Sequence, residues 1–316
     1  MRQAGSDSIS GAELATQLGV TRAAIWSHIQ DLRTLGYQIE ASPHDGYRLA
    51  GVPDVLHADD LLSRIHPSQI IGRDIRVFEK TTSTNDVVER LAHDGVKEGV
   101  VVFAEFQTKG RGRLGRTWIS PAKKGLWFSV LLRPGISPQD ATQLTVAAAT
   151  AISRAIKTET GLLVEIKWPN DLLLRGRKTG GILTELSAEL DSVRYVVLGI
   201  GLDVNISASE FPENLKKIAT SLKVELGRPI HRADLAEEVL RELDADYKRL
   251  QVGKFDEIAD EWESQCTTIG RNVIVNIGNS QTRGRAESLD STGALLVRTE
   301  YGRLERIIGG DVQIEK

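Results

Sequence analysis

The stretch Gly110-Arg111-Gly112-Arg113-Leu114-Gly115-Arg116-Thr117-Trp118 is the segment from which the fold and the site of this chain can be predicted. Six cations and no acid lie between Lys109 and Gly125, in a chain whose formal net charge is −3. The glycines leave the backbone free to bend and to approach a ligand closely. Backbone N–H groups and guanidinium groups together bind phosphate or carboxylate oxygens. The sequence therefore predicts an anion-binding loop.

Two other interpretations of this loop explain less of it. Gly110, Gly112 and Gly115 fit the Gly-x-Gly-x-x-Gly pattern of a dinucleotide-binding turn, which needs a strand before it and a helix that opens within it. An apolar strand does precede the loop, but Pro121 would break a helix that began there. A solvated basic surface loop would explain one or two of the charges, but not the alternation of glycine and arginine that ends in Trp118.

The loop resembles the signature loop of the biotin protein ligases, and further segments similar to that family's pattern occur in the same order. These segments are Thr82-Ser83-Thr84-Asn85, Ala104-Glu105-Phe106-Gln107, Lys167-Trp168-Pro169-Asn170-Asp171, the run from Arg177 to Glu185, and the run from Gly199 to Asn205. In the last segment Asp203 stands where the family usually has asparagine. Each segment is a weak signal alone, but the ordered set covers the chain from Thr82 to Asn205.

The resemblance implies an α+β fold with three domains. We expect a winged helix-turn-helix domain over residues 1–51, a catalytic domain over 52–265 and a small SH3-like β-barrel over 266–316. The catalytic domain would be a mixed β-sheet with helices, as in the class II aminoacyl-tRNA synthetase-like biotin and lipoate ligases. A length of 316 residues agrees with two or three domains.

Composition excludes several other classes of protein. The chain is 41% hydrophobic and 26% charged, which is ordinary for a globular protein. Its one cysteine, Cys266, excludes an internal disulfide and a cysteine metal cage, and we expect it to be a small buried hydrophobe. No apolar run approaches the length of a membrane span, and no signal segment opens the sequence. We therefore expect a cytoplasmic protein with no membrane contact.

The first domain carries the pattern of a helix-turn-helix. Ser10 and Thr21 can cap two short helices, Gly19 and Gly36 can end them, and a hairpin around Pro43-His44-Asp45-Gly46 follows. This resembles the DNA-binding domain of those biotin ligases that double as repressors. The second helix would then enter the major groove of operator DNA. Its expected DNA-contacting residues are Thr21, Arg22, Ala24, Trp26, Ser27 and His28.

The charge of this domain leaves an alternative open. Residues 1–51 contain four cations and five acids, although phosphate contacts usually dominate affinity for DNA. A vestigial or protein-binding winged helix is the other interpretation.

The resemblance also assigns roles to residues of the catalytic domain. The catalytic residues would be Arg113, Lys178 and Asp171. The biotin-binding residues would be Ser83, Thr84, Asn85, Gln107, Gly110, Arg111, Arg113, Lys178 and Gly181. The residues at ATP and the adenylate would be Arg113, Arg116, Trp118 and Asn170. No protein ligand for a metal is expected, because Mg²⁺ would be bound through the phosphates of ATP.

Helix capping is the alternative for Ser83 and Thr84, and turn formation is the alternative for Asn170 and Asp171. The remaining segments predict scaffold. A strand over residues 100–104, apolar throughout, is expected to be buried on both faces, and a hairpin over 181–202 turns at Leu190-Asp191-Ser192. Long helices are expected over residues 137–161 and 234–250, and short strands over 272–308.

The predicted activity is ATP-dependent joining of biotin to a lysine of a biotin carboxyl carrier protein. Two anions, a carboxylate and a phosphate, must meet, and the cations of the loop and Lys178 would offset their repulsion. We expect the loop to be mobile without ligand and to close over the adenylate. A biotin-responsive repressor that forms a homodimer would use the same ligand. The alternatives are a lipoate-type ligase and a ligand-sensing regulator without ligase activity.

Overall fold

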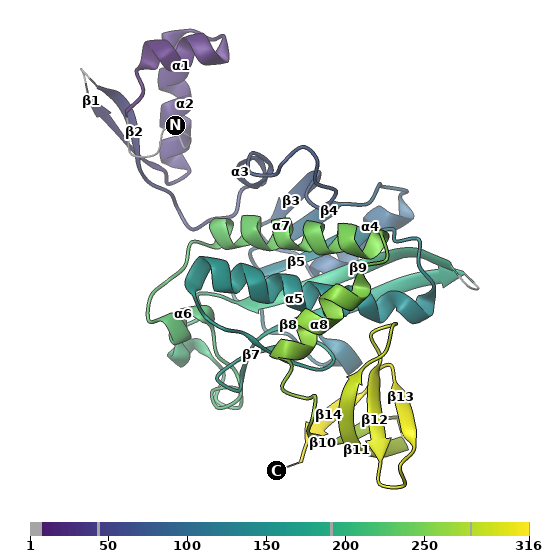
Figure 1. The fold of residues 1–316 in the computed structure, drawn as a ribbon. Helices are drawn as coiled ribbons and strands as arrows, with labels where there is room; N and C mark the ends of the chain where they lie inside the picture. The colour runs from purple at the N-terminus through teal and green to yellow at the C-terminus, as the bar shows by residue number, and fades with distance from the viewer. Residues whose placement is uncertain (1–7, 43–44, 190–191, 279, 316) are drawn as a thin grey trace. The chain divides into compact units, whose positions relative to one another are not determined.

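The computed structural model describes residues 8–42, 45–189, 192–278 and 280–315. The chain divides into two compact units, Met1–Val55 and Leu56–Lys316, which are described separately (Figure 1). Among the described residues, every helix is too short or too polar to cross a bilayer.

The first unit is a helix-turn-helix followed by a hairpin. Its elements are α1 (Gly11–Leu18), α2 (Arg22–Thr34), β1 (Gln38–Ser42) and β2 (Gly46–Gly51). The hydroxyl groups of Ser10 and Thr21 accept hydrogen bonds from the first turns of α1 and α2 at 3.1 and 3.2 Å. Gly19 ends α1 with φ at 65°, in the left-handed region that glycine tolerates best. The predicted caps are therefore confirmed.

A small apolar core holds this first unit together. Leu14, Ile25, Ile29 and Ile39 are buried in one cluster to which both helices and β1 contribute. The hairpin strands are antiparallel, as expected. The first two residues of the expected turn, Pro43-His44, lie outside the described residues.

The second unit is built on a seven-stranded mixed sheet. Its strands are β3 (Asp74–Phe78), β4 (Val100–Ala104), β5 (Gly125–Leu132), β6 (Glu165–Lys167), β7 (Asp171–Leu174), β8 (Arg177–Glu189) and β9 (Ser192–Asp203). Their order is β3-β4-β5-β9-β8-β7-β6. Only β3 and β4 pair in parallel among the described strands of this sheet; every other neighbouring pair is antiparallel.

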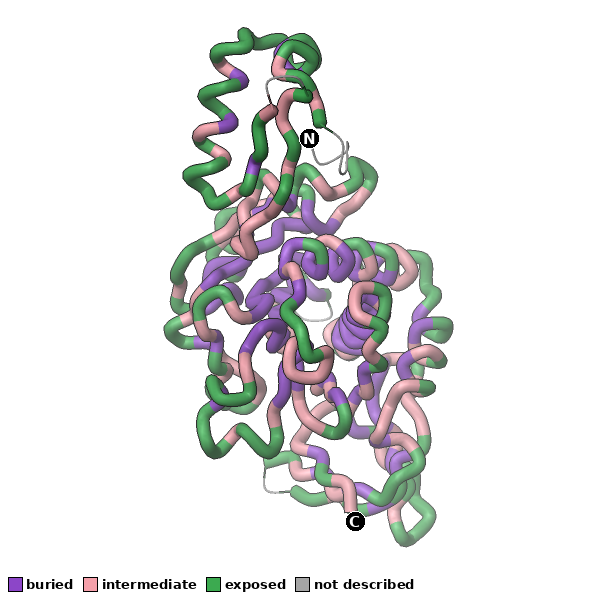
Figure 2. The backbone as a smooth tube through the Cα atoms, turned by 90° about the vertical axis from the view of Figure 1, so that its left-hand side faces the viewer, coloured by how far each residue is buried: buried purple, intermediate pink, exposed green. Residues whose placement is uncertain are grey.

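Helices cover both faces of this sheet. The longer ones are α4 (Thr84–His93), α5 (Ala141–Thr160), α7 (Arg232–Gln251) and α8 (Phe255–Gln265), and α3 (Ala58–Leu62) and α6 (Leu222–Leu226) are short. Side chains of β4 alternate between two cores: Val101 and Phe103 join the main core with α5 and α7, while Val100 and Val102 pack with α4. The prediction that this strand is buried on both faces is confirmed. Figure 2 shows the buried residues in the interior and the exposed ones around them.

Several elements differ from the sequence-based prediction. Residues 168–170 form a turn, as Asn170-Asp171 indicates, but the strand β7 that follows it and pairs with β6 was not predicted. A tight turn at Arg175-Gly176, both with positive φ, leads into β8. Arg177 and Lys178 therefore lie at the start of a strand. Of the expected hairpin turn, residues 190–191 lie outside the described residues.

The last part of the second unit is a five-stranded antiparallel sheet. Its strands are β10 (Asn272–Ile277), β11 (Ser280–Leu289), β12 (Leu295–Thr299), β13 (Leu304–Ile307) and β14 (Asp311–Ile314), in the order β13-β12-β11-β10-β14. Four of the strands agree with the prediction, and β14 was missed. The buried side chains of this five-stranded sheet, including Val273, Ala286 and Val297, join the main core of the unit.

Candidate active site

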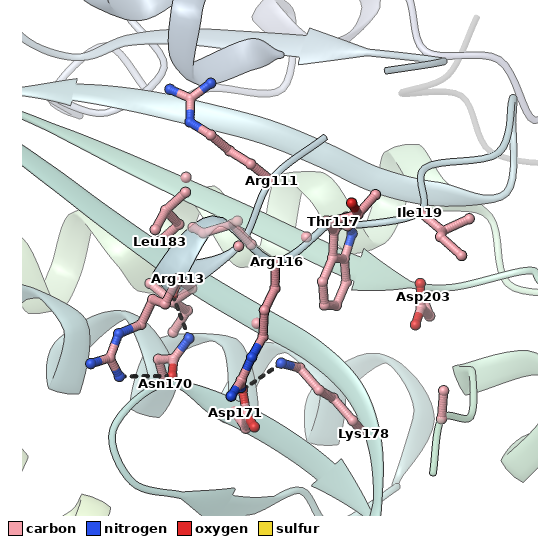
Figure 3. A pocket seen from close by; sticks show the side chains of 18 of the residues that line it. Arg111, Arg113, Arg116, Thr117, Ile119, Asn170, Asp171, Lys178, Leu183 and Asp203 are labelled. Atoms are coloured by element: carbon pink, nitrogen blue, oxygen red, sulfur yellow. Dashed lines mark hydrogen bonds and ion pairs between the residues drawn. The ribbon is translucent and has the colours of Figure 1, made fainter. Parts of the chain in front are cut away.

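The second unit contains a cavity of about 540 Å³, a volume within the usual range for small-molecule sites (Figure 3). It is lined by residues of the glycine-arginine loop, by β7, β8 and β9, by the segment 203–219 and by residues 310–312. The cavity therefore gathers most of the segments that the sequence singled out. Residues of two further segments, 206–219 and 310–312, also line it.

Residues 110–118, here called the flap, form a narrow hairpin-like loop. The N–H of Gly112 donates to the carbonyl of Arg116 at 2.7 Å, and the N–H of Trp118 donates to the carbonyl of Gly110 at 2.9 Å. The tip is a single 3-10 turn in which Leu114 and Gly115 have positive φ. No α-helix begins in this described segment, so the dinucleotide-binding interpretation is excluded.

One end of the cavity is polar and lies at the start of α4. Ser83, Thr84 and Asn85 are each 3% exposed. The hydroxyl of Ser129 donates to Oδ1 of Asn85 at 2.5 Å, and its oxygen lies 2.7 Å from Oγ1 of Thr84. Gln107 accepts from the N–H of Thr84 at 2.8 Å. The side chain of Ser83 makes no capping hydrogen bond, so capping does not explain it.

Arg111 belongs to this polar end. Its guanidinium donates to both oxygens of Glu185, at 3.1 and 2.9 Å, and to Asp86. Although burial alone would raise the pKa of Asp86, hydrogen bonds from Thr82 and Arg111 hold it below its usual value. Figure 3 shows Arg111 directed away from Arg113 and Lys178. The expectation that it joins them at the reacting groups therefore does not agree with this arrangement.

The other part of the cavity is cationic. The Lys178 ammonium lies 2.5 Å from a carboxylate oxygen of Asp171 and 5.3 Å from the ring centroid of Trp118. Arg113 donates to Oδ1 of Asn170 at 3.2 Å, and the amide nitrogen of Asn170 donates to the carbonyl of Ile182 at 2.8 Å. Figure 3 shows the Arg113, Asn170, Asp171 and Lys178 side chains grouped together.

Arg113 differs from its neighbours because no described carboxylate lies within ion-pair distance of it. Arg111 pairs with Asp86 and Glu185, and Arg116 pairs with Asp311 at 3.1 Å. Burial lowers the pKa of Arg113, while the charges of Asp171 and Asp311 oppose that shift. A half-buried guanidinium with only an amide partner is suited to receive an anion from a ligand.

Glycines of β8 and β9 form the floor of the cavity. A Cβ on Gly199 would lie 2.2 Å from Oδ1 of Asn85, and one on Gly201 would lie 2.6 Å from Nε1 of Trp118. A Cβ on Gly181 would meet Lys178 at 3.3 Å and Trp118 at 3.4 Å. The close approach of functional side chains therefore requires glycine at 199 and 201 and leaves little room beside Gly181, and all three have ordinary φ values.

Several lining residues were missed by sequence reasoning. Ser129, which holds Thr84 and Asn85, is a fully buried serine in the otherwise apolar strand β5, and that contrast is a signal that could have found it. Ile206 and Phe211 cluster with Trp127, and Trp118 packs against them. Nothing local in the sequence indicates that they reach the site.

Two further residues bear on the chemistry. Cys266 is a free, half-buried thiol whose pKa is raised by burial, so it is not poised as a thiolate nucleophile. Asp203 is 6% exposed and lines the cavity, and burial raises the pKa of its carboxyl well above the usual value, with Lys178 opposing.

The predicted DNA-contacting residues can be placed within the first unit alone. Arg22, Trp26, Ser27 and His28 are exposed on α2, Thr21 is exposed at its start, and Ala24 is half-buried. Within residues 8–42 and 45–55, Arg48 pairs with Glu40 and Arg33 donates to the carbonyl of Ile39. These side chains are therefore exposed among the described residues, and their contact with DNA stays a prediction.

Three family models match this chain. The biotin/lipoate A/B protein ligase family matches residues 77–203, a helix-turn-helix domain matches residues 1–48, and the biotin protein ligase C-terminal domain matches residues 268–314. The chain is 38% identical to a bifunctional ligase/repressor of Bacillus spizizenii, covering 99% of this chain and 95% of that protein. It is 31% identical to the bifunctional ligase/repressor of Escherichia coli, covering 96% and 92%.

A solved structure supports the same conclusion. The biotin protein ligase of Aquifex aeolicus in complex with biotin and ATP superposes with a TM-score of 0.66 at 31% identity, covering 77% of this chain and 99% of that one. The fold and the cationic cavity define a protein ligase that carries its own helix-turn-helix domain. The chain belongs to the biotin protein ligase family, and along nearly its whole length it is similar to the family's bifunctional ligase/repressors.

Proposed function

We propose that this chain activates biotin with ATP to biotinyl-5'-AMP and then transfers biotin to a lysine of a biotin carboxyl carrier domain. The observation that carries the proposal is a single cavity that joins a buried polar end to a cationic part in which Arg113 has no carboxylate partner. Such a site can hold a neutral polar ring and two anionic groups at once.

Biotin would lie with its ureido ring at the polar end. Ser83, Thr84, Asn85 and Gln107 offer both donors and acceptors there, and hydrogen bonds among themselves and to Ser129 already hold Thr84, Asn85 and Gln107. A buried site that matches N–H and C=O groups rejects ligands that lack them. In our proposal Gly110 and Arg111 shape this end, since a Cβ on Gly110 would lie 2.4 Å from the carbonyl oxygen of Trp118.

In the first reaction a carboxylate oxygen of biotin attacks the α-phosphorus of ATP. The bond from that phosphorus to the bridging oxygen breaks, and pyrophosphate leaves with the electron pair. Arg113 and Lys178 would stabilise the negative charge shared by the carboxylate and the α-phosphate, with Gly181 leaving room beside them. Arg116 would contact the phosphates from the flap. Asn170 and Trp118 would position the adenylate.

In the second reaction a lysine amine of the acceptor attacks the acyl carbon. The bond between that carbon and the phosphate oxygen breaks, AMP leaves, and the nitrogen loses a proton. Asp171, which lies beside Lys178, is the carboxylate that we assign to orienting the incoming amine. No covalent bond to the enzyme forms in this scheme, in agreement with the raised pKa of Cys266.

Magnesium fits this site through the nucleotide. No group of three or more potential metal-binding side chains occurs among the described residues, and Mg²⁺ is commonly bound by substrate phosphates with one or two carboxylates. When bound, the ion would neutralise charge on the leaving pyrophosphate. Asp171 is a lining carboxylate that pairs with Lys178 at 2.5 Å.

The first unit adds a regulatory role to the proposal. The family's bifunctional ligase/repressors and the exposed surface of α2 support binding to operator DNA. A homodimer would match a two-fold operator, and the adenylate would be the corepressor. We assign the protein to the cytoplasm, where both acceptor and operator would be present.

A test is biotin-dependent exchange between ATP and pyrophosphate, with biotinyl-5'-AMP detected directly and a carrier domain added afterwards. We expect exchange with biotin but not with lipoate, and transfer to the carrier lysine. Exchange with lipoate alone would show a lipoate-type ligase. Binding of biotin without exchange would show a ligand-sensing regulator, and either result would refute the proposal.

A further inference from the structure

Lys178 is the second residue of β8, and a neighbouring segment of chain lies on each side of it. On one side it pairs with Leu173 of β7. On the other side its N–H donates to the carbonyl of Ile218 and its carbonyl accepts from the N–H of Thr220, both at 2.8 Å. The backbone of this lysine is therefore held by the segment that follows β9, which also lines the cavity.

Glu225 on α6 connects the two sides of this contact. Its Oε1 atom accepts from the hydroxyl of Thr220 and from the guanidinium of Arg177, both at 2.6 Å. Its Oε2 atom lies 3.5 Å from Nε of Arg175. Arg177 precedes Lys178 in β8, and Thr220 belongs to the segment opposite. One carboxylate therefore holds the start of β8 to the segment beyond β9.

The carboxylate of Glu225 is buried, whereas its arginine partners reach solvent. The side chain of Glu225 is 2% exposed, and those of Arg177 and Arg175 are 37% and 78% exposed. Hydrogen bonds to a buried charged group are stronger than those to an exposed one. If the charge of Glu225 is removed, water can solvate both guanidinium groups, so no buried cation is left unpaired.

The helix that carries Glu225 is itself anchored at the end of β9. The hydroxyl of Ser221, the N-cap of α6, donates to the carbonyl of Ile206 at 2.6 Å. The N–H of Lys223 donates to the carbonyl of Val204 at 2.8 Å. Because α6 is fixed to the chain just beyond the sheet, Glu225 holds β8 from a defined position.

The ammonium of Lys178 depends on this support for its place in the cavity. It lies 2.5 Å from a carboxylate oxygen of Asp171, a contact that Figure 3 draws as a dashed line. Its flexible four-carbon side chain begins at the backbone that Glu225 holds. The residues that line the cavity do not include Glu225, so it can act on a reaction there only through the residues that it holds.

We propose that Glu225 is a positioning residue for Lys178, and that it sets the distance from the ammonium to the reacting carboxylate and phosphate. The inference rests on the role proposed above for Lys178 in forming biotinyl-5'-AMP. A reacting group misplaced by about 1 Å can slow a reaction by about 10²-fold. Loss of the Glu225 carboxylate would allow a shift of this kind by freeing the first residues of β8.

The first test separates the rate of reaction from the binding of biotin. Glu225→Gln should lower kcat for formation of biotinyl-5'-AMP about tenfold or more, while the KM for biotin stays within about threefold of the wild type. The polar end of the cavity, where we place the ring of biotin, is built from α4 and Gln107, and Glu225 makes no hydrogen bond there. Glu225→Asp keeps the charge on a shorter side chain and should give an intermediate kcat.

Asp246 on α7 provides a matched control. Its side chain is 1% exposed and pairs with Arg154 at 2.6 Å and Arg249 at 2.9 Å, away from the residues that line the cavity. Asp246→Asn therefore also removes a buried carboxylate from between two arginines. It should lower the melting temperature as Glu225→Gln does, but keep kcat within about twofold of the wild type.

A double-mutant cycle tests whether Glu225 acts through Lys178. Single-turnover formation of biotinyl-5'-AMP, with enzyme in excess, keeps a rate slowed about 10²–10³-fold by Lys178→Ala measurable. Glu225→Gln should lower this rate in the wild-type background but cause no further fall in the Lys178→Ala background. Arg177→Ala removes the partly exposed side of the same contact and should give the same pattern, so the proposal is tested even if Glu225→Gln does not fold.

Wild-type kcat in Glu225→Gln and Arg177→Ala would overturn the proposal. An equal further fall in the Lys178→Ala background would also overturn it, as would the same loss of kcat in Asp246→Asn, because the effect would then come from the stability of the fold. No biotinyl-5'-AMP from the wild type, or wild-type rates in Lys178→Ala, would instead refute the proposed reaction at this site.

Discussion

The sharpest prediction concerns Arg113, because it is the flap guanidinium that pairs with no described carboxylate. Its charge is therefore not neutralised within the cavity, and it can interact fully with a reacting carboxylate and phosphate. Arg113→Ala should slow formation of biotinyl-5'-AMP far more than it weakens binding of biotin alone. The reason is that the two anions are forced together only in the transition state.

The size of the expected fall in rate for Arg113→Ala follows from the kind of contact that the substitution removes. Removing one donor aimed at developing negative charge costs about 2.7–4 kcal/mol, or roughly a 10²–10³-fold fall in kcat. Arg116, which we also place at the phosphates, is the comparison, because its side chain is 65% exposed and already pairs with Asp311. Exposed ion pairs contribute about 0–1 kcal/mol, so Arg116→Ala should lower the rate by less than about tenfold.

Single-turnover formation of biotinyl-5'-AMP, with pyrophosphate exchange as a second readout, measures this difference. Arg113→Lys should give an intermediate rate, because it keeps the charge but loses the bidentate geometry of the guanidinium. Melting temperatures of the Arg113 and Arg116 variants should be close to the wild type, since neither residue is part of a hydrophobic core. The reasoning would be refuted if Arg113→Ala reacted within about threefold of the wild type.

Three further predictions follow from the same geometry. Gly199→Ala would place a Cβ 2.2 Å from Oδ1 of Asn85. The KM for biotin should therefore rise about tenfold or more, while the KM for ATP changes little. Equal changes in both KM values would contradict the assignment of the polar end of the cavity to biotin. Limited trypsin digestion within residues 111–116 should slow when biotin and ATP are both present, and equal cutting with and without them would count against closure of the flap. Arg22→Ala should make the slope of log binding constant against log salt concentration shallower by about one unit in a filter-binding titration with operator DNA. Wild-type binding that does not depend on salt concentration would contradict the phosphate-contact model.

Local signals were sufficient for much of the fold. Serine and threonine caps and glycine stops predicted α1 and α2 because capping involves only neighbouring residues. The uninterrupted apolar run of β4 predicted a strand buried on both faces, and the two cores confirm it. Strand β7 was missed, because Asn170-Asp171 is a turn signal and the residues that follow form a strand only through their pairing with β6 and β8.

In the active site, too, the sequence predicted the residue types, while the fold decided which of them come together. The sequence identified Lys178 and Asp171 separately, but the hairpin of β7 and β8 brings the ammonium to 2.5 Å from the carboxylate. It identified the cations of the flap as one set, whereas the fold directs Arg111 to Glu185 and leaves Arg113 at Asn170. Charge can be counted along a chain, but which charges neutralise one another depends on residues far apart in sequence.

By itself, the sequence determined the kind of chemistry, because a glycine-arginine loop is suited to bind anions, and it determined the elements whose signals are local. Only the tertiary structure decided which cation stays available, which glycines are needed for close approach, and how Asp203 becomes a buried carboxyl whose pKa is raised. The physical reason is that burial and ion pairing are properties of the packed surroundings, and β5, β8, β9 and the C-terminal sheet supply those surroundings from distant parts of the chain.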